Sequence, residues 1–424
     1  MQLQPTLIGL AASLLVAGTA PALAQTKADF DALRDEIRQL REELNAMKKG
    51  QAGAPRPADA SGWGDRIEQL EIKSKDAVVL GDIGGGFRLP GSETSIRLYG
   101  HAEAHAIHDL KAWSGSDNFT DLGSQPVSGQ KGRTKLTAET SRFGFETATP
   151  TGAGSFNTKV EADFYAYGSD NRNRLRLRHA YGEYAGFLVG QTWSTFMDLD
   201  NLPETVDFNG PIGSPFSRRT MIRYTYGDAK AGYKVAVALE DPQDQFGGDS
   251  ASERMPQIVA RYDQSFSWGA LNLRGLAHEK RIGTASKRGY GWGVGGSFKL
   301  TDKDLLMAQY AMVQGDFDQM YGSNGYALDT STGEIGLDRN QGLVLGYAKT
   351  FSDRLRGTLA FGMNKARTEQ LLDNKRLQQF HFNLIYAPIK NVELGGEVVL
   401  GERKAFAGDV AKMQRVDLMG RYSF

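Results

Sequence analysis

The chain has 424 residues, its 50 lysines and arginines are balanced by 50 aspartates and glutamates, and it contains no cysteine. The lack of cysteine excludes disulfide bonds, thiolate metal sites and cysteine nucleophiles. The balanced charge gives no indication of a nucleic-acid partner, so the basic residues have to be interpreted locally.

The first residues have the features of a signal peptide. The sequence MQLQPTLIGLAASLLVAGTAPALAQ has an apolar stretch from Leu7 to Ala17 and small residues at Ala22–Ala24, although no Lys or Arg precedes the apolar stretch. We expect a signal peptide at residues 1–24, with Gln25 as the first residue of an exported chain. No later apolar run reaches about 18 residues, so no transmembrane helix is expected.

Residues 25–49 have a heptad pattern. Apolar residues recur at alternating spacings of four and three, at Phe30, Leu33, Ile37, Leu40, Leu44 and Met47. This pattern predicts a coiled coil that joins copies of the chain, and an amphipathic helix lying on its own domain is the alternative. Because about three heptads are marginally stable alone, the coiled coil would need another domain to hold the chains together.

Residues 50–92 read as a linker and a short helix that lead to the next domain. The segment KKGQAGAPRPADASG is rich in Pro, Ala and Gly, and a short polar helix is expected from Trp63 to about Ser74. The segment GDIGGGFRLPG at residues 81–91 does not match GxGxxG, and no amphipathic helix follows it. It therefore favours an extended entry to a sheet over a nucleotide-binding loop.

From residue 93 the periodicity becomes that of strands. In the final segment MQRVDLMGRYSF, Val416 and Leu418 share one face, whereas Arg415 and Asp417 share the other. We predict sixteen strands of this kind, at residues 94–107, 134–147, 155–167, 173–184, 187–195, 218–227, 232–241, 255–265, 270–281, 287–300, 305–314, 338–350, 355–364, 376–388, 392–401 and 413–424. The second of these segments does not keep one register, and a bulge near Ser141 would reconcile its two halves.

The connections between these segments alternate in length. Short ones include residues 149–154, 227–231, 301–304, 351–354 and 387–391, and long ones include 108–133, 196–217, 242–254 and 315–337. This alternation is typical of an outer-membrane barrel with short periplasmic turns and long outer loops. We therefore predict an all-β transmembrane barrel of 16 antiparallel strands at residues 93–424, in the outer membrane of a Gram-negative bacterium, with an N-terminal helical or coiled-coil extension in the periplasm. A soluble β-sandwich would need neither sixteen strands nor charges on a constant face.

Two basic groups are predicted to face the inside of the barrel. The stretch NRNRLRLRHAYGEY has arginine at every second position, at Arg172, Arg174, Arg176 and Arg178, with Leu175 and Leu177 between the last three. Because arginine facing lipid would cost a few kcal/mol per residue, the leucines are expected to meet lipid and the arginines to line the water-filled lumen. In SPFSRRTMIRYTY the same alternation directs Arg219 and Arg223 inward.

The loop between these groups is acidic. It carries Asp198, Asp200, Glu204 and Asp207 and no Lys or Arg, and it is the third long loop, which in general porins folds into the barrel. An acidic loop facing a basic wall would produce a transverse field in a narrow throat, and rows of arginine favour anions. The alternative is that the arginines pair with inward acids, because KVEADFY directs Lys159, Glu161 and Asp163 to the same side.

Catalysis is not expected. A hydrolase needs a nucleophile, a base and an orienting group, yet no G-x-S-x-G segment occurs. On a strand, His101 and His105 would lie roughly 13 Å apart, too far to share a metal ion. We therefore expect no enzyme activity, no metal and no cofactor. A structural anchor or spacer with a plugged barrel is the remaining alternative, although no segment resembles a peptidoglycan-binding domain.

Several segments are similar to those of a known family. GQTWSTFMDLD and LRLRHAYGEY are the most specific, and the likeness extends over nearly the whole mature chain to the C-terminal Phe424. The chain resembles the DcaP-like family of trimeric outer-membrane porins of Gram-negative bacteria. The resemblance implies a homotrimer in contact with the lipid bilayer and lipopolysaccharide. It also implies passive diffusion of small polar or anionic solutes such as dicarboxylates, through a constriction lined by the arginines and the loop acids named above. The inward Glu161 and Asp163 depart from a simple anion-selective arrangement.

Overall fold

The computed structural model describes residues 35, 38–39, 42, 79–110, 122–123, 132–167, 173–242, 253–316, 318–320, 322, 324–370 and 373–424. These residues belong to two compact units, residues 1–97 and residues 98–424. The predicted signal peptide, most of the heptad segment and the linker with its short polar helix lie outside the described residues and stay predictions.

The first unit contains little regular structure among its described residues. Asp35, Arg38, Gln39 and Glu42 of the predicted heptad segment are helical, and Arg38 pairs with Asp35 at 2.7 Å. The apolar heptad positions lie outside the described residues, so the coiled coil stays a prediction. The strands β1 (Val79–Leu80) and β2 (Phe87–Arg88) form a short antiparallel pair across the glycine-rich segment. Within the part of the chain that is described, no helix is long and apolar enough to cross a membrane.

The second unit is a closed antiparallel barrel of 16 strands, with β4 and β5 counted as one interrupted strand. The strands are β3 (Ser95–Asp109), β4 (Arg133–Thr137), β5 (Arg142–Thr151), β6 (Gly154–Tyr167), β7 (Asn173–Tyr184), β8 (Phe187–Trp193), β9 (Arg218–Asp228), β10 (Tyr233–Glu240), β11 (Gln257–Phe266), β12 (Gly269–Ile282), β13 (Ala285–Thr301), β14 (Asp304–Gln314), β17 (Arg339–Ser352), β18 (Leu355–Ala366), β19 (Asn374–Tyr386), β20 (Val392–Ala405) and β21 (Val410–Ser423). All sixteen predicted strands are confirmed, and each predicted end lies within four residues of the observed one.

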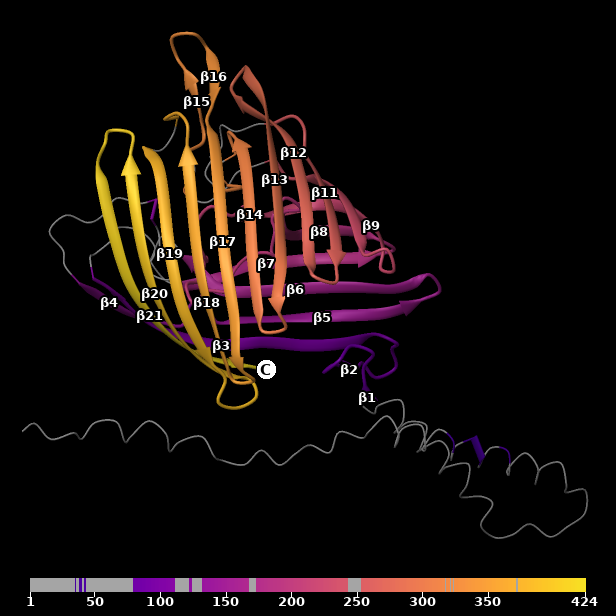
Figure 1. Ribbon diagram of the computed structural model, residues 1–424. Coiled ribbons are helices and arrows are strands. Elements are labelled where there is room, and N and C mark those ends of the chain that lie inside the picture. The colour runs from indigo at the N-terminus through magenta and orange to yellow at the C-terminus, as the bar shows by residue number, and fades with distance from the viewer. Residues whose placement is uncertain are drawn as a thin grey trace, which may run out of the picture. The chain divides into compact units, whose positions relative to one another are not determined.

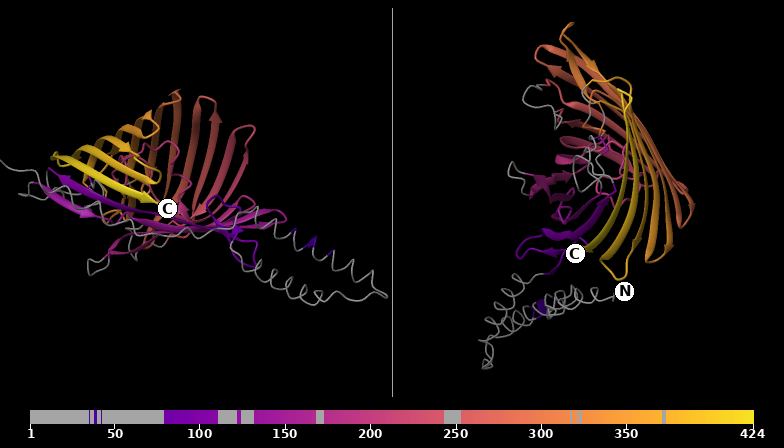
Figure 2. Two further views of the ribbon diagram at one scale, coloured as in Figure 1. Left: turned by 90° about the horizontal axis from the view of Figure 1, so that it is seen from below. Right: turned by 90° about the vertical axis from the view of Figure 1, so that its left-hand side faces the viewer.

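The barrel closes between its last and first strands. Neighbours along the chain pair with each other, and β21 pairs antiparallel with β3. Between β14 and β17, which also pair, the chain forms a separate hairpin of β15 (Tyr326–Asp329) and β16 (Glu334–Leu337). Figure 1 shows β14 and β17–β21 side by side. The turned views show the yellow C-terminal strand beside the indigo β3 (Figure 2).

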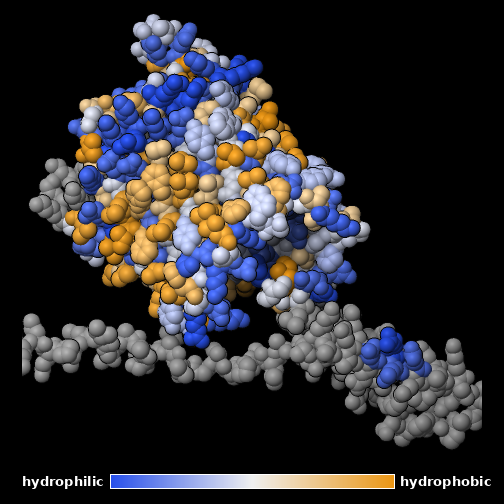
Figure 3. Space-filling view, in the orientation of Figure 1, coloured by the Kyte–Doolittle hydropathy of each residue, from blue (hydrophilic) through white to orange (hydrophobic). Residues whose placement is uncertain are grey.

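The alternation of side chains along the strands determines which residues cover the outside of the barrel. In β7, Leu175 and Leu177 are 57% and 49% exposed, whereas Arg178 is 5% exposed. The same alternation recurs in β21, where Leu418 is exposed and Asp417 is buried. Figure 3 shows a broad hydrophobic area over the lower part of the strands that face the viewer, with hydrophilic residues above it. This is the surface that a barrel presents to lipid.

The predicted irregularity near Ser141 is present. β4 ends at Thr137 and a turn follows it. In this turn the N–H of Ser141 donates a hydrogen bond of 3.0 Å to the carbonyl of Ala138. The Ser141 hydroxyl accepts the N–H of Glu103 at 3.0 Å and donates to its carbonyl at 3.1 Å, which replaces the missing ladder bonds. The strand therefore continues in the wall, and Arg142 begins its second half in a new register.

Residues 194–217, which connect β8 to β9, lie inside the barrel. The carbonyl of Phe196 accepts a hydrogen bond of 2.9 Å from Arg274 in β12. The N–H of Val206 donates to Glu397 in β20, also at 2.9 Å. A loop that reaches inward-facing side chains of strands this far apart has to cross the lumen.

Three apolar side chains fix this inner loop to the wall. Phe196, Val206 and Ile212 are buried in three separate apolar clusters with inward-facing residues of the strands. The partners include Leu188, Met221, Val259, Leu276, Leu377, Met413, Ile385 and Met419. The inner face of the wall is therefore apolar where the loop packs and polar elsewhere, a distinction that alternation along one strand does not reveal.

Candidate functional site

The first two acidic residues of the inner loop are held by the opposite wall. Asp198 is fully buried and accepts a hydrogen bond of 2.7 Å from Asn272 in β12. Arg261 in β11 lies 3.6 Å from Asp198 and 3.0 Å from Asp200. Both carboxylates therefore neutralise a wall arginine that is distant from the arginine row in the sequence.

The other two acidic residues of the loop also meet wall arginines. Glu204 accepts two hydrogen bonds of 2.8 Å from Arg356 in β18. Asp207 is 2% exposed, and its Oδ2 lies 3.9 Å from Nη1 of Arg415 in β21. The loop acids thus act as anchors to β11, β18 and β21, instead of forming a free acidic face opposite Arg174, Arg176 and Arg178.

The arginines of β7 pair with the inward acids of β6. Arg176 donates two hydrogen bonds to Asp163, at 2.9 and 2.7 Å. Arg178 donates to Glu161 at 2.7 Å and to Asp163 at 2.8 Å. The alternative interpretation of the sequence, that these arginines pair with neighbouring acids, therefore describes the contacts of Arg176 and Arg178.

A bulge changes the direction of side chains in the middle of β7. Glu161 of β6 is opposite His179 of β7, and Ala162 is opposite Leu177. Arg178 therefore has no opposite residue in β6 and is the extra residue of the bulge. Both Arg178 and His179 are consequently buried on the inner side, at 5% and 6% exposed. The bulge lets β7 present two polar side chains in succession next to the loop.

The remaining members of the predicted basic groups have different environments. Arg174 is exposed at the start of β7, and Arg172 lies outside the described residues. Arg219 is 3% exposed and donates from Nη2 to both oxygens of Asp316 at 3.0 Å, in the loop after β14. Burial alone would raise the pKa of the Asp316 carboxyl, but Arg219 and then Lys280 lower it to about 2. Arg219 therefore anchors an outer loop.

Arg223 and Lys159 lie further along the wall. Arg223 is half-buried, and its Nε has no hydrogen-bond partner among the described residues. Lys159 pairs with Glu146 at 3.0 Å, and its ammonium lies 4.9 Å from the ring centroid of Tyr99. Neither residue lines the cavity that remains between the inner loop and the wall.

An opening of about 260 Å³ remains between the inner loop and one side of the wall. Its lining contains four arginines, two carboxylates, one histidine and three aromatic rings, namely Arg142, Arg178, Arg218, Arg421, Glu103, Asp207, His101, Trp193, Phe208 and Phe216, with Thr205 and Val206. With histidine neutral, the four arginines exceed the two carboxylates by two formal charges. Of the predicted residues, the structure brings Arg178 and Asp207 to this opening, with Arg176, Glu161 and Asp163 directly behind Arg178.

Arg218 differs from the other arginines of the opening because it has no carboxylate partner among the described residues. Its guanidinium carbon lies 4.4 Å from the ring centroid of Trp193, its cross-strand neighbour. Its Nη1 is buried without a hydrogen-bond partner within the described part of the chain. A cation held by an aromatic face, with donors left over, is suited to accept an anion.

Three arginines of the opening were missed by the sequence analysis, for different reasons. Arg421 lies on the charged face of the last strand, so alternation alone could have found it. Arg142 follows the interruption at Ser141, which makes its direction unpredictable. Strict alternation along β9 would place Arg218 on the same outer face as the exposed Thr220. Arg218 instead points inward, because the inner loop joins the wall at the start of β9.

The charged groups of the opening are held by neighbouring side chains. Within the described residues, no cluster of three or more His, Asp or Glu side chains could hold a metal ion. Glu103 is engaged by Arg421 and by His105, at 3.0 Å from the latter. What the opening provides is a set of fixed guanidinium groups beside flat aromatic rings.

Comparison with known proteins agrees with this architecture. The family described as DcaP outer membrane protein matches residues 88–424. The crystal structure of the outer membrane channel DcaP of Acinetobacter baumannii superposes with a TM-score of 0.73 at 30% identity, covering 80% of this chain and 100% of that chain.

More distant similarities concern the fold. The anion-selective porin from Comamonas acidovorans superposes with a TM-score of 0.55 at 15% identity, covering 78% of this chain and 100% of that one. Porin Omp2b of Brucella canis is 25% identical over 248 aligned positions, in a match that covers 54% of this chain. The match spans 64% of that porin, slightly less than two thirds of its length.

Proposed function

The chain belongs to the DcaP outer membrane protein family, and we propose that it is a passive channel for small hydrophilic solutes with a preference for anions. The observation that carries this proposal is the opening between the inner loop and the wall, where four arginines face two carboxylates. Solutes move down their concentration gradient, and the channel needs no cofactor, covalent step or energy source.

The inner loop sets the width of the passage. It is fixed by the buried side chains of Phe196, Val206 and Ile212 and by the pairs that its acids make with Arg261, Arg356 and Arg415. Because these contacts hold the loop from several strands, the passage keeps a constant shape. Size exclusion by a rigid loop is the first component of selectivity.

Charge is the second component. Arg178 is committed to Glu161 and Asp163, whereas Arg218 has donors to spare. Guanidinium groups bind carboxylate in a two-point geometry, and a surplus of positive charge in a narrow throat favours anions. This charge pattern suits small dicarboxylates, with one carboxylate bound by Arg218 and the other by a second arginine of the opening.

We also place the working unit in the outer membrane as a homotrimer, with the N-terminal segment in the periplasm. The exposed apolar surface of the barrel supports contact with lipid and with other barrels, and the heptad at residues 25–49 supports association of the extensions. Purified protein in detergent should run as a trimer that dissociates on heating.

Swelling of liposomes tests the proposal directly. Purified protein is reconstituted and the liposomes are exposed to succinate or, as a control of equal chain length, to 1,4-diaminobutane. Faster swelling in the dicarboxylate is expected. Equal or faster swelling in the diamine would refute the anion preference while keeping the channel. No swelling in either solute would favour the structural anchor with a plugged barrel.

A further inference from the structure

A row of cations crosses the outer surface of the barrel near its loop-bearing end. In the strand register, Lys365 of β18 is opposite Arg376 of β19, and Arg376 is opposite Lys404 of β20. Lys412 of β21 is opposite Glu402, which precedes Lys404 by two residues on β20. We refer to Lys365, Arg376, Lys404 and Lys412 as the outer cation row.

These four side chains point away from the lumen. Arg376 shares its face of β19 with Phe380 and Phe382, which are 54% and 51% exposed, while His381 between them is buried. Lys412 likewise shares its face with the exposed Val416. The outer cation row is therefore separate from the opening inside the barrel.

The row is not neutralised by the protein. Arg376 pairs with Glu402 at 2.9 Å, but Lys365, Lys404 and Lys412 form no side-chain ion pair or hydrogen bond within the described residues. Like charges directly opposite each other on neighbouring strands are destabilising. Four cations against one carboxylate leave a site that a multivalent anion would stabilise.

The other described acidic residues in the adjoining loops are Glu369, Asp373 and Asp409, and none of them forms an ion pair with the row. Asp373 is engaged by the backbone N–H groups of Phe406 and Ala407, at 2.8 and 3.4 Å. Asp409 lies in the loop between β20 and β21. The anion that completes the row has to come from outside the described part of the chain.

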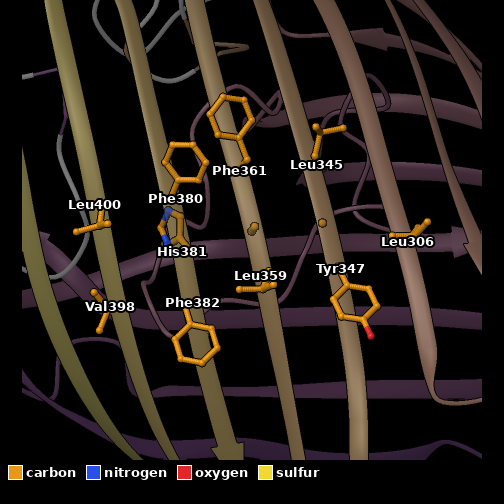
Figure 4. A pocket seen from close by; sticks show the side chains of 12 residues that line it. Leu306, Leu345, Tyr347, Leu359, Phe361, Phe380, His381, Phe382, Val398 and Leu400 are labelled. Carbon is orange, nitrogen blue, oxygen red and sulfur yellow. The ribbon is translucent and has the colours of Figure 1, made fainter.

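An apolar trough of about 430 Å³ lies further along the outer face, across β14 and β17–β20, so that β18, β19 and β20 carry both trough residues and cations of the row. Figure 4 shows its two edges as rows of outward side chains. The upper edge is formed by Leu345, Phe361, Phe380 and Leu400, and the lower edge by Leu306, Tyr347, Leu359, Phe382 and Val398. Its length across neighbouring strands and its apolar lining suit a hydrocarbon chain.

The spacing of the two features matches the profile of a membrane surface. Arg376 precedes Phe380 by four residues, on the order of 13 Å along the strand. The apolar belt of such barrels ends at the level of the lipid headgroups. Because the strands are tilted relative to the membrane normal, a trough that runs across them extends from the headgroup level into the hydrocarbon. The cations are therefore at headgroup level on the long-loop side, which is the outer side of the membrane.

We propose that the outer cation row binds the phosphate groups of an outer-leaflet glycolipid, the lipid A portion of lipopolysaccharide, and that the trough takes one of its acyl chains. Charge complementarity selects this occupant, because a single molecule then supplies both the phosphates and the hydrocarbon. A second copy of this chain would need an acidic surface at the same level. The site acts on the outer surface and does not depend on the proposed channel function.

Native mass spectrometry of the detergent-solubilised protein tests the site. Wild type is compared with the triple variant Lys365→Gln, Lys404→Gln and Lys412→Gln, which leaves the pair of Arg376 with Glu402 intact. The matched control, Lys299→Gln, Lys303→Gln and Lys390→Gln, makes the same charge change at the exposed opposite end of the strands. Heat-dependent mobility on gels reports the folding and the trimer of each of the three proteins. The ligands are bisphosphorylated lipid A, dephosphorylated lipid A and phosphatidylethanolamine.

We expect wild type and control to bind bisphosphorylated lipid A equally, and the triple variant to bind it at least about tenfold more weakly. We also expect wild type to prefer bisphosphorylated lipid A over both other lipids. Equal binding by the triple variant, or equal binding of dephosphorylated lipid A by wild type, would overturn the assignment. Loss of the trimer with unchanged lipid binding would identify the row as a contact between copies and would also overturn it.

Discussion

A Cβ atom added to Gly342 of β17 would lie 2.0 Å from the carbonyl oxygen of Gly213 in the inner loop. No side chain can stand at Gly342 while the loop keeps its position. Gly213 itself has a φ of 100°, which other residues rarely adopt. The loop is thus seated on the wall by direct contact between two backbones.

Gly342→Val is expected to displace the loop from β17. The single-channel conductance should rise, and the free energy of unfolding should fall by about 1–3 kcal/mol, as in other overpacked sites. Planar-bilayer recording and thermal unfolding measure the two effects. The control is Gly420→Val in β21, where an added Cβ meets no atom within 4 Å. An unchanged conductance in Gly342→Val would contradict the role of the loop in setting the width.

Arg218→Gln is expected to weaken the anion preference. The variant removes the one arginine of the opening that lacks a carboxylate partner among the described residues. The anion-to-cation permeability ratio should therefore fall about two- to threefold, which corresponds to the free energy of a partly exposed ion pair. The reversal potential in a salt gradient measures this ratio. Arg223→Gln, on the same strand but outside the opening, makes the same charge change and should have a smaller effect. Equal shifts in both variants would mean that the charge of the whole lumen, and not Arg218, sets the selectivity.

Sequence patterns predict the wall of this barrel well because each strand carries its own information. In β7 the leucines and arginines alternate between lipid and lumen, and the predicted span 173–184 is the observed one. The break at Ser141 was also visible, because the two halves of that segment disagree about which face is apolar.

The interior is harder to predict because its contacts join residues that are distant in the sequence. The pairing of Glu204 with Arg356 spans 152 positions, and no local pattern connects them. Arg218 departs from alternation because its strand begins where the chain bends inward. The sequence therefore indicates that the loop is acidic and the wall basic, but not which arginines the acids neutralise.

Phe196→Ala is expected to loosen the inner loop. The ring is fully buried in an apolar cluster, and its removal should lower the free energy of unfolding by about 3–5 kcal/mol and increase fluctuations of the open-channel current. Leu199→Ala is the matched control in the same loop, because Leu199 is 44% exposed. Thermal unfolding and current noise are the measurements. Similar effects of the two substitutions would argue against the anchoring role of Phe196.

Asp316→Asn is expected to destabilise the protein in a pH-dependent way. At pH 7 the variant leaves the buried Arg219 without its bidentate partner and with Asp318 at 3.9 Å as the remaining carboxylate, which should cost about 3 kcal/mol. The folded-state pKa of Asp316 is lowered from 3.8 to about 2, so its contribution is complete above pH 4 and is lost as the pH falls towards 2.

The difference in thermal midpoint between wild type and Asp316→Asn should therefore narrow as the pH falls from about 4 towards 2. A difference that stays constant over this range would show that the ionisation of Asp316 does not contribute to stability. Asp302→Asn, at an exposed position in the turn between β13 and β14, serves as the control.

The reversal potential of the wild-type channel across a KCl gradient tests the central claim most directly. The purified protein is inserted into a planar bilayer and the potential at zero current is recorded. We predict stepwise conductance with a potential that favours chloride, because the opening carries more arginines than carboxylates. A potential that favours potassium, from a correctly folded protein, would contradict the assignment of the arginine-lined opening as the selectivity site.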